Sequence, residues 1–152
     1  MSVAVKPITP VVPASRVTVR WQDLDPLGHV GHTVFLAYLE EARNALLDAH
    51  GIALDGYVVA AATLNYRNEI RMGTAFVRGC CRVTRVGRTS VTMEEQLRAP
   101  DGRLLADATV VVVLWDPVER RPRAVSAAER ATLQTASTAS VERPTSELKE
   151  IA

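Results

Sequence analysis

The sequence contains no run of about 18 apolar residues, the length that a helix needs to cross the hydrocarbon core of a membrane. It therefore predicts no membrane span. The chain also lacks an excess of either charge, because 18 Lys and Arg residues stand against 17 Asp and Glu residues, for a formal net charge of +1. Such a chain has no overall field to attract nucleic acid or an anionic membrane. We expect no nucleic-acid partner and only local binding of anions.

Cysteine is scarce, and the only two, Cys80 and Cys81, are neighbours in the sequence. Neighbouring residues on a strand point to opposite faces of the sheet, so a disulfide between them is not expected. The opening stretch "MSVAVKPITPVVP" is interrupted by a lysine and by prolines, which is a poor match to a signal peptide. These features predict a reduced, cytoplasmic protein.

The length of 152 residues fits one domain with a substantial core. We expect a flexible N-terminal arm at 1–13, a single domain at 14–135, and a flexible tail at 136–152, where Ser, Thr, Glu and Lys are frequent. Within the domain, residues 16–21 alternate polar and apolar side chains and predict a strand. A second capped helix is predicted from Ser126, because Glu129 follows at the spacing of a capping box.

One long amphipathic helix is predicted over residues 35–49, with His50 in its last turn and Gly51 as its C-terminal cap. Its apolar side chains recur at steps of three and four residues. They are Phe35, Tyr38, Leu39, Ala42, Leu46 and Ala49. At least one of Glu40 and Glu41 is expected to face solvent, and Glu41 and Arg43 are interpreted as ordinary residues of the polar face.

Four strands are predicted at 57–70, 74–87, 88–99 and 103–116. The short connections between the last three force antiparallel pairing. The run "VVVVLW" (110–115) is continuously apolar, which predicts a central strand covered on both faces. One helix that buries its stripe on such a sheet gives an α+β fold. A single helical layer leaves sheet surface or edges open, so we also expect a dimer.

The densest polar stretch is "WQDLDPLGHVGH" (21–32), directly before the long helix. Asp25 with Pro26 and Gly28 is typical of a turn. The same carboxylate would also lie at a helix N-terminus, where unpaired N–H groups can bind an oxyanion and a carboxylate can act as base or nucleophile. Gly28 and Gly31 favour this hypothesis, since they let backbone N–H groups approach a ligand.

A metal site is the competing interpretation of this stretch, because His29 and His32 lie near Asp23 and Asp25. Their spacing matches no strong metal motif, and we expect no metal. The ordinary alternatives are a loop histidine packed on the sheet for His29 and a polar helix-start residue for His32. Asp23 is expected to be a solvated strand-end or capping residue.

The pattern as a whole resembles the hotdog-fold acyl-CoA thioesterases of the 4-hydroxybenzoyl-CoA thioesterase-like family. The resemblance covers roughly residues 15 to 132 and includes "FLAYLEEAR", "LNYRNEIRMG" and "RVGRTSVTMEEQL". Its loop motif, Asp-x-x-Gly-His-Val-Asn-Asn in the family, corresponds here to Asp25, Gly28, His29, Val30, Gly31 and His32. The resemblance implies a hotdog fold, in which a curved antiparallel sheet wraps a long central helix, and a homodimer or homotetramer.

The resemblance also implies roles for individual residues. Asp25 would be the general base or nucleophile, and the backbone N–H of His32 would form the oxyanion hole, with Gly31 and His29 completing the catalytic loop. Basic and hydroxyl residues near the turn "RVGRTS" would bind coenzyme A, unless they are ordinary exposed strand residues; they are Arg85, Arg88, Thr89 and Ser90.

Four positions differ from the usual family pattern. Gly31 and His32 each replace an Asn, although His is found at the second position in one bacterial short-chain acyl-CoA subgroup, Glu69 replaces a Pro, and Thr74 replaces an Asp. The expected reaction is hydrolysis of an acyl-CoA or acyl-carrier-protein thioester without cofactor or metal, since a thioester needs only a carboxylate and an oxyanion hole. Two alternatives remain open at this point. "DLDPLGH" superficially resembles the hydratase motif Asp-x-Asn-Pro-x-His of hotdog enoyl-CoA hydratases, and the same cleft could serve a non-catalytic acyl-CoA or acyl-carrier-protein binding module.

Overall fold

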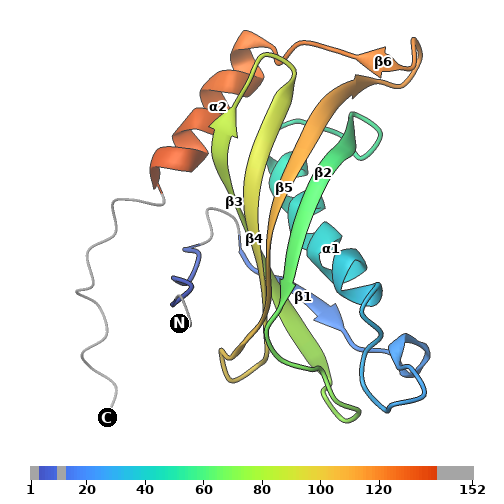
Figure 1. The fold of residues 1–152 in the computed structure, drawn as a ribbon. Helices are drawn as coiled ribbons and strands as arrows, with labels where there is room; N and C mark the ends of the chain where they lie inside the picture. Colours follow the sequence, from blue (N-terminus) through green and yellow to red (C-terminus); the bar gives the residue numbers. More distant parts are fainter. Residues whose placement is uncertain (1–3, 10–12, 140–152) are drawn as a thin grey trace, which may run out of the picture.

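The computed structural model describes residues 4–9 and 13–139 of the chain and has an α+β fold, as predicted. Six antiparallel strands form one sheet in the order β1-β3-β4-β5-β2, with β6 paired to β5 (Figure 1). The strands are β1 (Ser15–Thr18), β2 (Tyr57–Tyr66), β3 (Phe76–Val86), β4 (Ser90–Arg98), β5 (Leu104–Asp116) and β6 (Arg121–Pro122). The helices are the 3-10 turn η1 (Trp21–Asp23), α1 (Val34–Ala49) and α2 (Ala127–Ala139). Within residues 4–9 and 13–139, no helix has both the length and the apolar character needed to cross a membrane.

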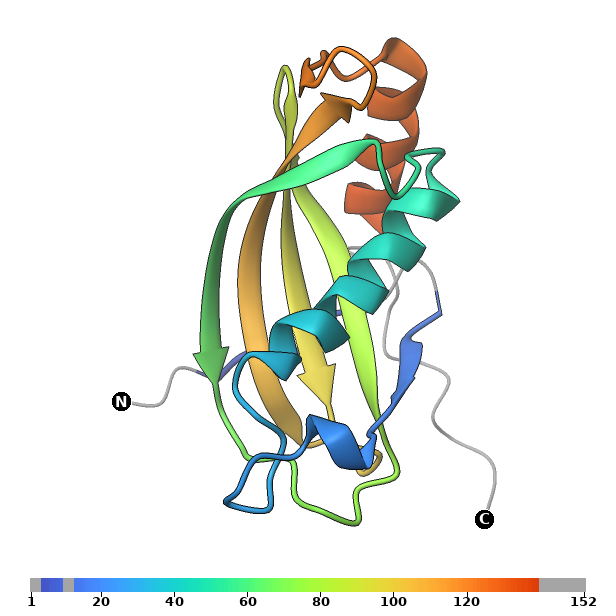
Figure 2. The same ribbon diagram turned by 90° about the vertical axis from the view of Figure 1, so that its right-hand side faces the viewer.

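Helix α1 lies diagonally across the concave face of the curved sheet (Figure 2). Its predicted apolar stripe is buried against β3 and β4 except for Ala49, which is exposed, and Leu39 and Leu46 are completely inaccessible to solvent. Each such leucine contributes about 1.5–3 kcal/mol to the free energy of folding. α1 lies close to β3 at Gly79, where an added Cβ atom would stand 2.9 Å from the Cβ of Ala42. This glycine therefore sets how closely the helix and the sheet pack.

The predicted end of α1 is confirmed. Gly51 has a φ of +80°, a left-handed conformation that glycine adopts without strain, and the ring nitrogen Nδ1 of His50 lies 2.7 Å from the carbonyl oxygen of Leu46. The second helix also begins as predicted. The backbone N–H of Glu129 donates to Ser126 Oγ at 3.1 Å, and the Glu129 carboxylate accepts from the Ser126 N–H at 2.9 Å.

The first predicted strand was too long. β1 ends at Thr18, and Trp21 belongs to η1, because the Asp23 carboxylate accepts the backbone N–H of Arg20 at 2.9 Å and closes a tight turn. The prediction for the apolar run 110–115 was right in part. β5 is an interior strand, and Val110, Val112 and Leu114 are buried, but the alternate side chains are only half-buried because no layer formed by residues 4–9 and 13–139 covers them.

The placement of Arg43 on a solvent-facing side was wrong. Its side chain is only 4% exposed and forms a two-point ion pair with Glu95, which is fully buried on β4. A helix face that looks polar in the sequence can thus bury a charge when the sheet beneath it supplies the opposite one.

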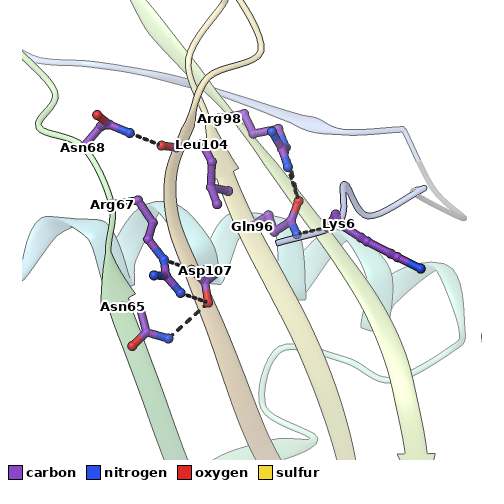
Figure 3. Close-up of polar contacts among 8 residues, drawn as sticks. All are labelled: Lys6, Asn65, Arg67, Asn68, Gln96, Arg98, Leu104 and Asp107. Atoms are coloured by element: carbon purple, nitrogen blue, oxygen red, sulfur yellow. Dashed lines mark hydrogen bonds and ion pairs between the residues drawn. The ribbon is translucent and has the colours of Figure 1, made fainter. Parts of the chain in front are cut away.

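Both chain ends contain ordered contacts near the predicted boundaries. In the predicted arm, the backbone N–H of Ile8 donates to Gln96 Oε1 at 3.1 Å, and Gln96 Nε2 donates to the carbonyl oxygen of Lys6 (Figure 3). Helix α2 continues past residue 135, with Leu133 and Ala136 buried against the sheet. The division at 13 and 135 stays a prediction, and residues 1–3, 10–12 and 140–152 lie outside the described residues.

Candidate active site

The loop before α1 holds the Asp25 carboxylate by short-range hydrogen bonds. The N–H of Leu27 donates to Asp25 Oδ1 at 2.9 Å, and the N–H of Gly28 donates to the Asp25 carbonyl at 3.0 Å. The Asp25 N–H in turn donates to the His29 carbonyl at 2.8 Å. Gly28 has a φ of +77°, which a residue with a side chain rarely adopts. The predicted turn is therefore present, and it fixes the orientation of one carboxylate.

At the entry into α1, the backbone N–H groups of Gly31 and His32 differ in their partners. The N–H of Gly31 donates to the Asp23 carbonyl at 3.0 Å, whereas the N–H of His32 makes no hydrogen bond within the described residues. The His32 carbonyl accepts the Tyr66 hydroxyl at 2.9 Å, which ties the helix start to the end of β2. An unpaired N–H at a helix N-terminus is a ready donor for an anion.

Asp25 and His32 line the same cavity, of about 450 Å³. Its lining residues come from the loop, the first turn of α1, the end of β2 and the segment that follows β2. They are Asp25, Leu27, His29, Val30, His32, Phe35, Tyr66, Arg67, Asn68 and Glu69. Apolar walls with convergent polar groups are typical of small-molecule sites. The structure thus brings together Asp25, His29 and His32 from the predicted site, with Gly31 between the last two in the loop.

His29 stands between two carboxylates. Its Nε2 lies 3.1 Å from Asp25 Oδ2, and its Nδ1 is hydrogen-bonded to Glu69 Oε2 at 3.2 Å. Arg71 binds the other oxygen of Glu69. Hydrogen bonds from Arg71 first, and from His29 second, hold the pKa of the Glu69 carboxyl below its ordinary value.

Asp23 has a structural position, separate from the cavity. It is 6% exposed, accepts the Tyr38 hydroxyl at 2.6 Å, and accepts the backbone N–H of Arg20. Burial alone would raise the pKa of Asp23, but the hydrogen bonds from Tyr38 and Arg20 outweigh it and hold that pKa below its ordinary value. The prediction of a capping residue is confirmed, and the prediction of a solvated one was wrong.

The residues predicted to bind coenzyme A lie at the other end of the molecule. Arg85, Arg88, Thr89 and Ser90 belong to the β3–β4 hairpin, at the top of Figures 1 and 2, whereas the Asp25 loop is at the bottom. Arg82, on β3, forms an ion pair with Glu94 on the neighbouring strand β4. Within one chain these residues do not meet Asp25, and their role stays a prediction.

Sequence reasoning missed the polar residues that follow β2. Glu69 was noted only as a departure from proline, and its contact with His29 joins residues 40 positions apart. Arg67 is held by Asp107, which also accepts Asn65 Nδ2 at 3.1 Å, and Asn68 Nδ2 donates to the Leu104 carbonyl at 2.7 Å (Figure 3). The one signal available was the clustering of polar residues directly after an apolar strand.

In the part of the chain that is described, no three His, Cys, Asp or Glu side chains are arranged to hold a metal ion.

The fold and this loop define a class of protein. The sequence model of the thioesterase-like superfamily matches residues 19–137, so the chain belongs to that superfamily. The match confirms the family resemblance found in the sequence.

Individual relatives agree with this assignment. The acyl-CoA thioester hydrolase YbgC of Escherichia coli is 28% identical over 116 residues, which make up 72% of this chain and 86% of that protein. A Thermus thermophilus thioesterase, solved in complex with coenzyme A and Zn, has 32% identity and a TM-score of 0.70, over 86% of this chain and 95% of its own. A thioesterase-superfamily protein of Jannaschia sp. CCS1 has 28% identity and a TM-score of 0.72, over 82% of each chain.

Proposed function

We propose that this protein is an acyl-CoA thioesterase, which hydrolyses a thioester to a free acid and a thiol. One observation carries the proposal: the fixed carboxylate of Asp25 and the unpaired N–H of His32 line the same cavity at the start of α1. These are the two groups that thioester hydrolysis requires, a base or nucleophile and a donor for the developing oxyanion.

The mechanism begins when the thioester carbonyl binds with its oxygen at the His32 N–H. The positive end of the α1 dipole strengthens this contact as negative charge develops on the oxygen. Asp25 then either removes a proton from an attacking water or attacks the carbonyl carbon itself. Because a thioester is already reactive, these groups suffice, and loss of one oxyanion donor typically costs about 10²–10³ in rate.

The acyl group would occupy the apolar part of the cavity, beside Leu27, Val30 and Phe35. Coenzyme A is the favoured thiol carrier, because the E. coli relative is named an acyl-CoA thioester hydrolase and the Thermus relative was solved with coenzyme A. An acyl-carrier protein carries the same thioester. Arg85, Arg88, Thr89 and Ser90 would meet the coenzyme A of a site in a neighbouring subunit, since they are remote from Asp25 in their own chain.

A homodimer is the smallest assembly that we propose, and two such dimers would give a tetramer. The support is β2, which forms one edge of the sheet and is exposed along almost its whole length although it is rich in Val and Ala. A long apolar edge strand is a template for pairing with another strand. Pairing two copies of β2 would extend the sheet, with α1 of each copy as the long central helix of a hotdog fold. We also propose a cytoplasmic location, because the chain has only two cysteines and so lacks the disulfide framework of many secreted domains.

The deciding experiment measures release of free thiol from a panel of acyl-CoA substrates by the wild type, Asp25→Asn and Asp25→Ala. We expect hydrolysis by the wild type and a loss of about 10²–10⁴ in kcat for both variants, as for removal of a catalytic base. Activity that survives both substitutions would refute the role of Asp25. Hydration of an enoyl-CoA without thiol release, or binding without turnover, would replace the proposal by the hydratase or the binding module.

A further inference from the structure

The start of α1 is held by contacts from outside the helix. Thr33 stands at the N-cap position, but within the described part of the chain its side chain makes no capping hydrogen bond, and its φ and ψ of −70° and −26° are already helical. An N-cap side chain normally accepts a backbone N–H of the first turn and so stabilises the helix start. In this chain another element has to supply that support.

Tyr66, the last residue of β2, supplies such a contact. The end of β2 lies beside the start of α1, and the Tyr66 hydroxyl donates to the His32 carbonyl oxygen at 2.9 Å (Figure 2). The Tyr66 ring packs edge-to-face on Phe35, with ring centroids 5.2 Å apart. Tyr66, His32 and Phe35 all line the cavity that contains Asp25. A strand end is therefore fastened to the helix start at the candidate active site.

Tyr66 is itself held in place by the main chain on either side of it. It pairs with Ala106 in the antiparallel ladder between β2 and β5. The backbone N–H groups of the next two residues both donate to the Leu105 carbonyl, at 2.8 and 3.1 Å. Farther along, an isolated antiparallel bridge between His29 and Arg71 joins this segment to the loop before α1. The hydroxyl thus projects from a rigid base, which a positioning group requires.

The hydrogen bonds around His32 fix the direction of its N–H. That N–H belongs to the peptide unit between Gly31 and His32, whose carbonyl accepts the Val34 N–H at 2.9 Å. The next peptide unit, between His32 and Thr33, has its carbonyl bonded to Tyr66. Because each peptide unit is planar, two bonded carbonyls leave His32 little freedom to turn. Its N–H has no partner within the described residues and keeps one direction.

We propose that Tyr66 is a positioning residue of the oxyanion hole: its hydroxyl holds the His32 carbonyl, so that the His32 N–H stays directed at the substrate oxygen. The inference rests on the proposed thioesterase function and adds a residue to that site. Tyr66 acts only through the main chain of His32. A donor that is already in place costs no reorganisation when negative charge develops, and a misplacement of about 1 Å can cost about 10²-fold in rate.

Two other roles for Tyr66 make different predictions. Its side chain is 49% exposed, and a hydroxyl there would act as a tether that contributes to stability alone. Alternatively, the hydroxyl would contact the substrate directly, because Tyr66 lines the cavity. A tether changes stability and not the rate, and direct contact with the bound substrate changes KM. Positioning of an oxyanion donor lowers kcat and leaves KM nearly constant.

The first test compares Tyr66→Phe with Tyr57→Phe in the steady-state hydrolysis of an acyl-CoA that the wild type cleaves. Each variant loses one hydroxyl that joins β2 to α1 or to the residues leading into it, since the Tyr57 hydroxyl donates to Asn44 Oδ1. Tyr57 lies outside the cavity lining. We expect Tyr66→Phe to lower kcat about tenfold with KM changed by less than about twofold. The loss is smaller than the 10²–10³ for removal of an oxyanion donor, because the His32 N–H is still present.

Tyr57→Phe should leave kcat unchanged within about twofold. An unchanged kcat in Tyr66→Phe, a loss confined to KM, or equal losses of kcat in the two variants would overturn the inference. The midpoint of urea unfolding is measured for both. A loss of kcat that is explained by partial unfolding of Tyr66→Phe under the assay conditions would assign the hydroxyl as a tether.

The second test asks whether Tyr66 acts through the N–H of His32. His32→Pro removes that N–H, whereas His32→Ala removes the imidazole and keeps the N–H. Tyr66→Phe should cost about tenfold in kcat in the His32→Ala background and less than about twofold in the His32→Pro background. Equal losses in both backgrounds would contradict the inference. If circular dichroism shows that His32→Pro does not fold, the comparison of Tyr66→Phe with Tyr57→Phe decides alone.

The outcomes also separate this inference from the proposed function. If the wild type cleaves thioesters and Tyr66→Phe cleaves them at the same rate, only the positioning role fails, and Asp25 and His32 keep their proposed roles. If the wild type releases no thiol from any acyl-CoA of the panel, the positioning role falls together with the proposed function.

Discussion

Arg43 and Glu95 form a buried two-point ion pair that joins α1 to β4. Arg43 Nε lies 2.7 Å from Glu95 Oε1, and a second guanidinium nitrogen lies 3.1 Å from Oε2. Burial by itself would lower the pKa of Arg43, but the contacts with Glu95 outweigh it and raise that pKa. The helix and the sheet are thus joined by charge as well as by apolar packing.

Replacing one member of this pair should be costly. Arg43→Met leaves the Glu95 carboxylate buried without a partner, and we expect the free energy of unfolding to fall by about 3–5 kcal/mol. Urea denaturation followed by circular dichroism measures the change. The matched control is Arg82→Met, which breaks a partly exposed pair with Glu94 and should cost less than about 1 kcal/mol. Similar losses in the two variants would contradict the burial argument.

Gly79 is predicted to be required for the contact between α1 and β3. In Gly79→Ala the new methyl group would stand 2.9 Å from Ala42 Cβ, and this overpacking should cost about 1–3 kcal/mol. Adding Ala42→Gly should restore much of the stability, because it removes the atom that is struck. Gly31→Ala is the control for thermal denaturation, since its Cβ would find its nearest neighbour at an ordinary 3.8 Å.

The cap of α2 should make stability depend on acidity. Hydrogen bonds from Arg123 first, and then from Ser126, lower the pKa of Glu129 to about 2, below its unfolded value. A carboxyl with a lowered folded pKa stabilises the fold above its unfolded pKa, and this contribution is lost as the pH falls toward the folded pKa. Glu129→Gln should therefore cost about 1–2 kcal/mol at pH 7, and the difference from wild type should shrink between about pH 4.5 and 2. A difference that does not change over this interval in urea titrations would argue against the shift.

The exposed edge at β2 is predicted to be the contact between subunits. Val59 is 47% exposed on this strand, and Val59→Lys would place a charge in a strand pair of two copies. Sedimentation velocity should show an oligomer for the wild type and a monomer for the variant. Val118→Lys changes an even more exposed valine in the turn after β5 and should leave the oligomer intact. Dissociation by both variants would indicate a different interface.

The sequence was sufficient for features that depend on neighbours in the chain. The stripe from Phe35 to Ala49 predicted α1 to within a residue of its start, and Asp25 with Gly28 predicted a turn that the structure contains. Contacts between distant segments were not predictable in this way. The pairing of Arg43 with Glu95 depends on the register of β4 beneath the helix, and that of His29 with Glu69 on how a loop meets the end of β2. Neither of these two contacts can be predicted from the local pattern of residues.

The short antiparallel bridge between His29 and Arg71, which joins the Asp25 loop to the segment after β2, determines which substitutions this region tolerates. Its bonds use the N–H groups of Val30 and Met72 and the carbonyls of Ile70 and Gly28, which almost any residue can supply. The N–H of Glu69 donates no hydrogen bond within the described residues, and this is the position where the family pattern places proline, the one residue that lacks that donor. The side chain at position 69 can therefore be changed, to proline included, without loss of a main-chain hydrogen bond in this bridge.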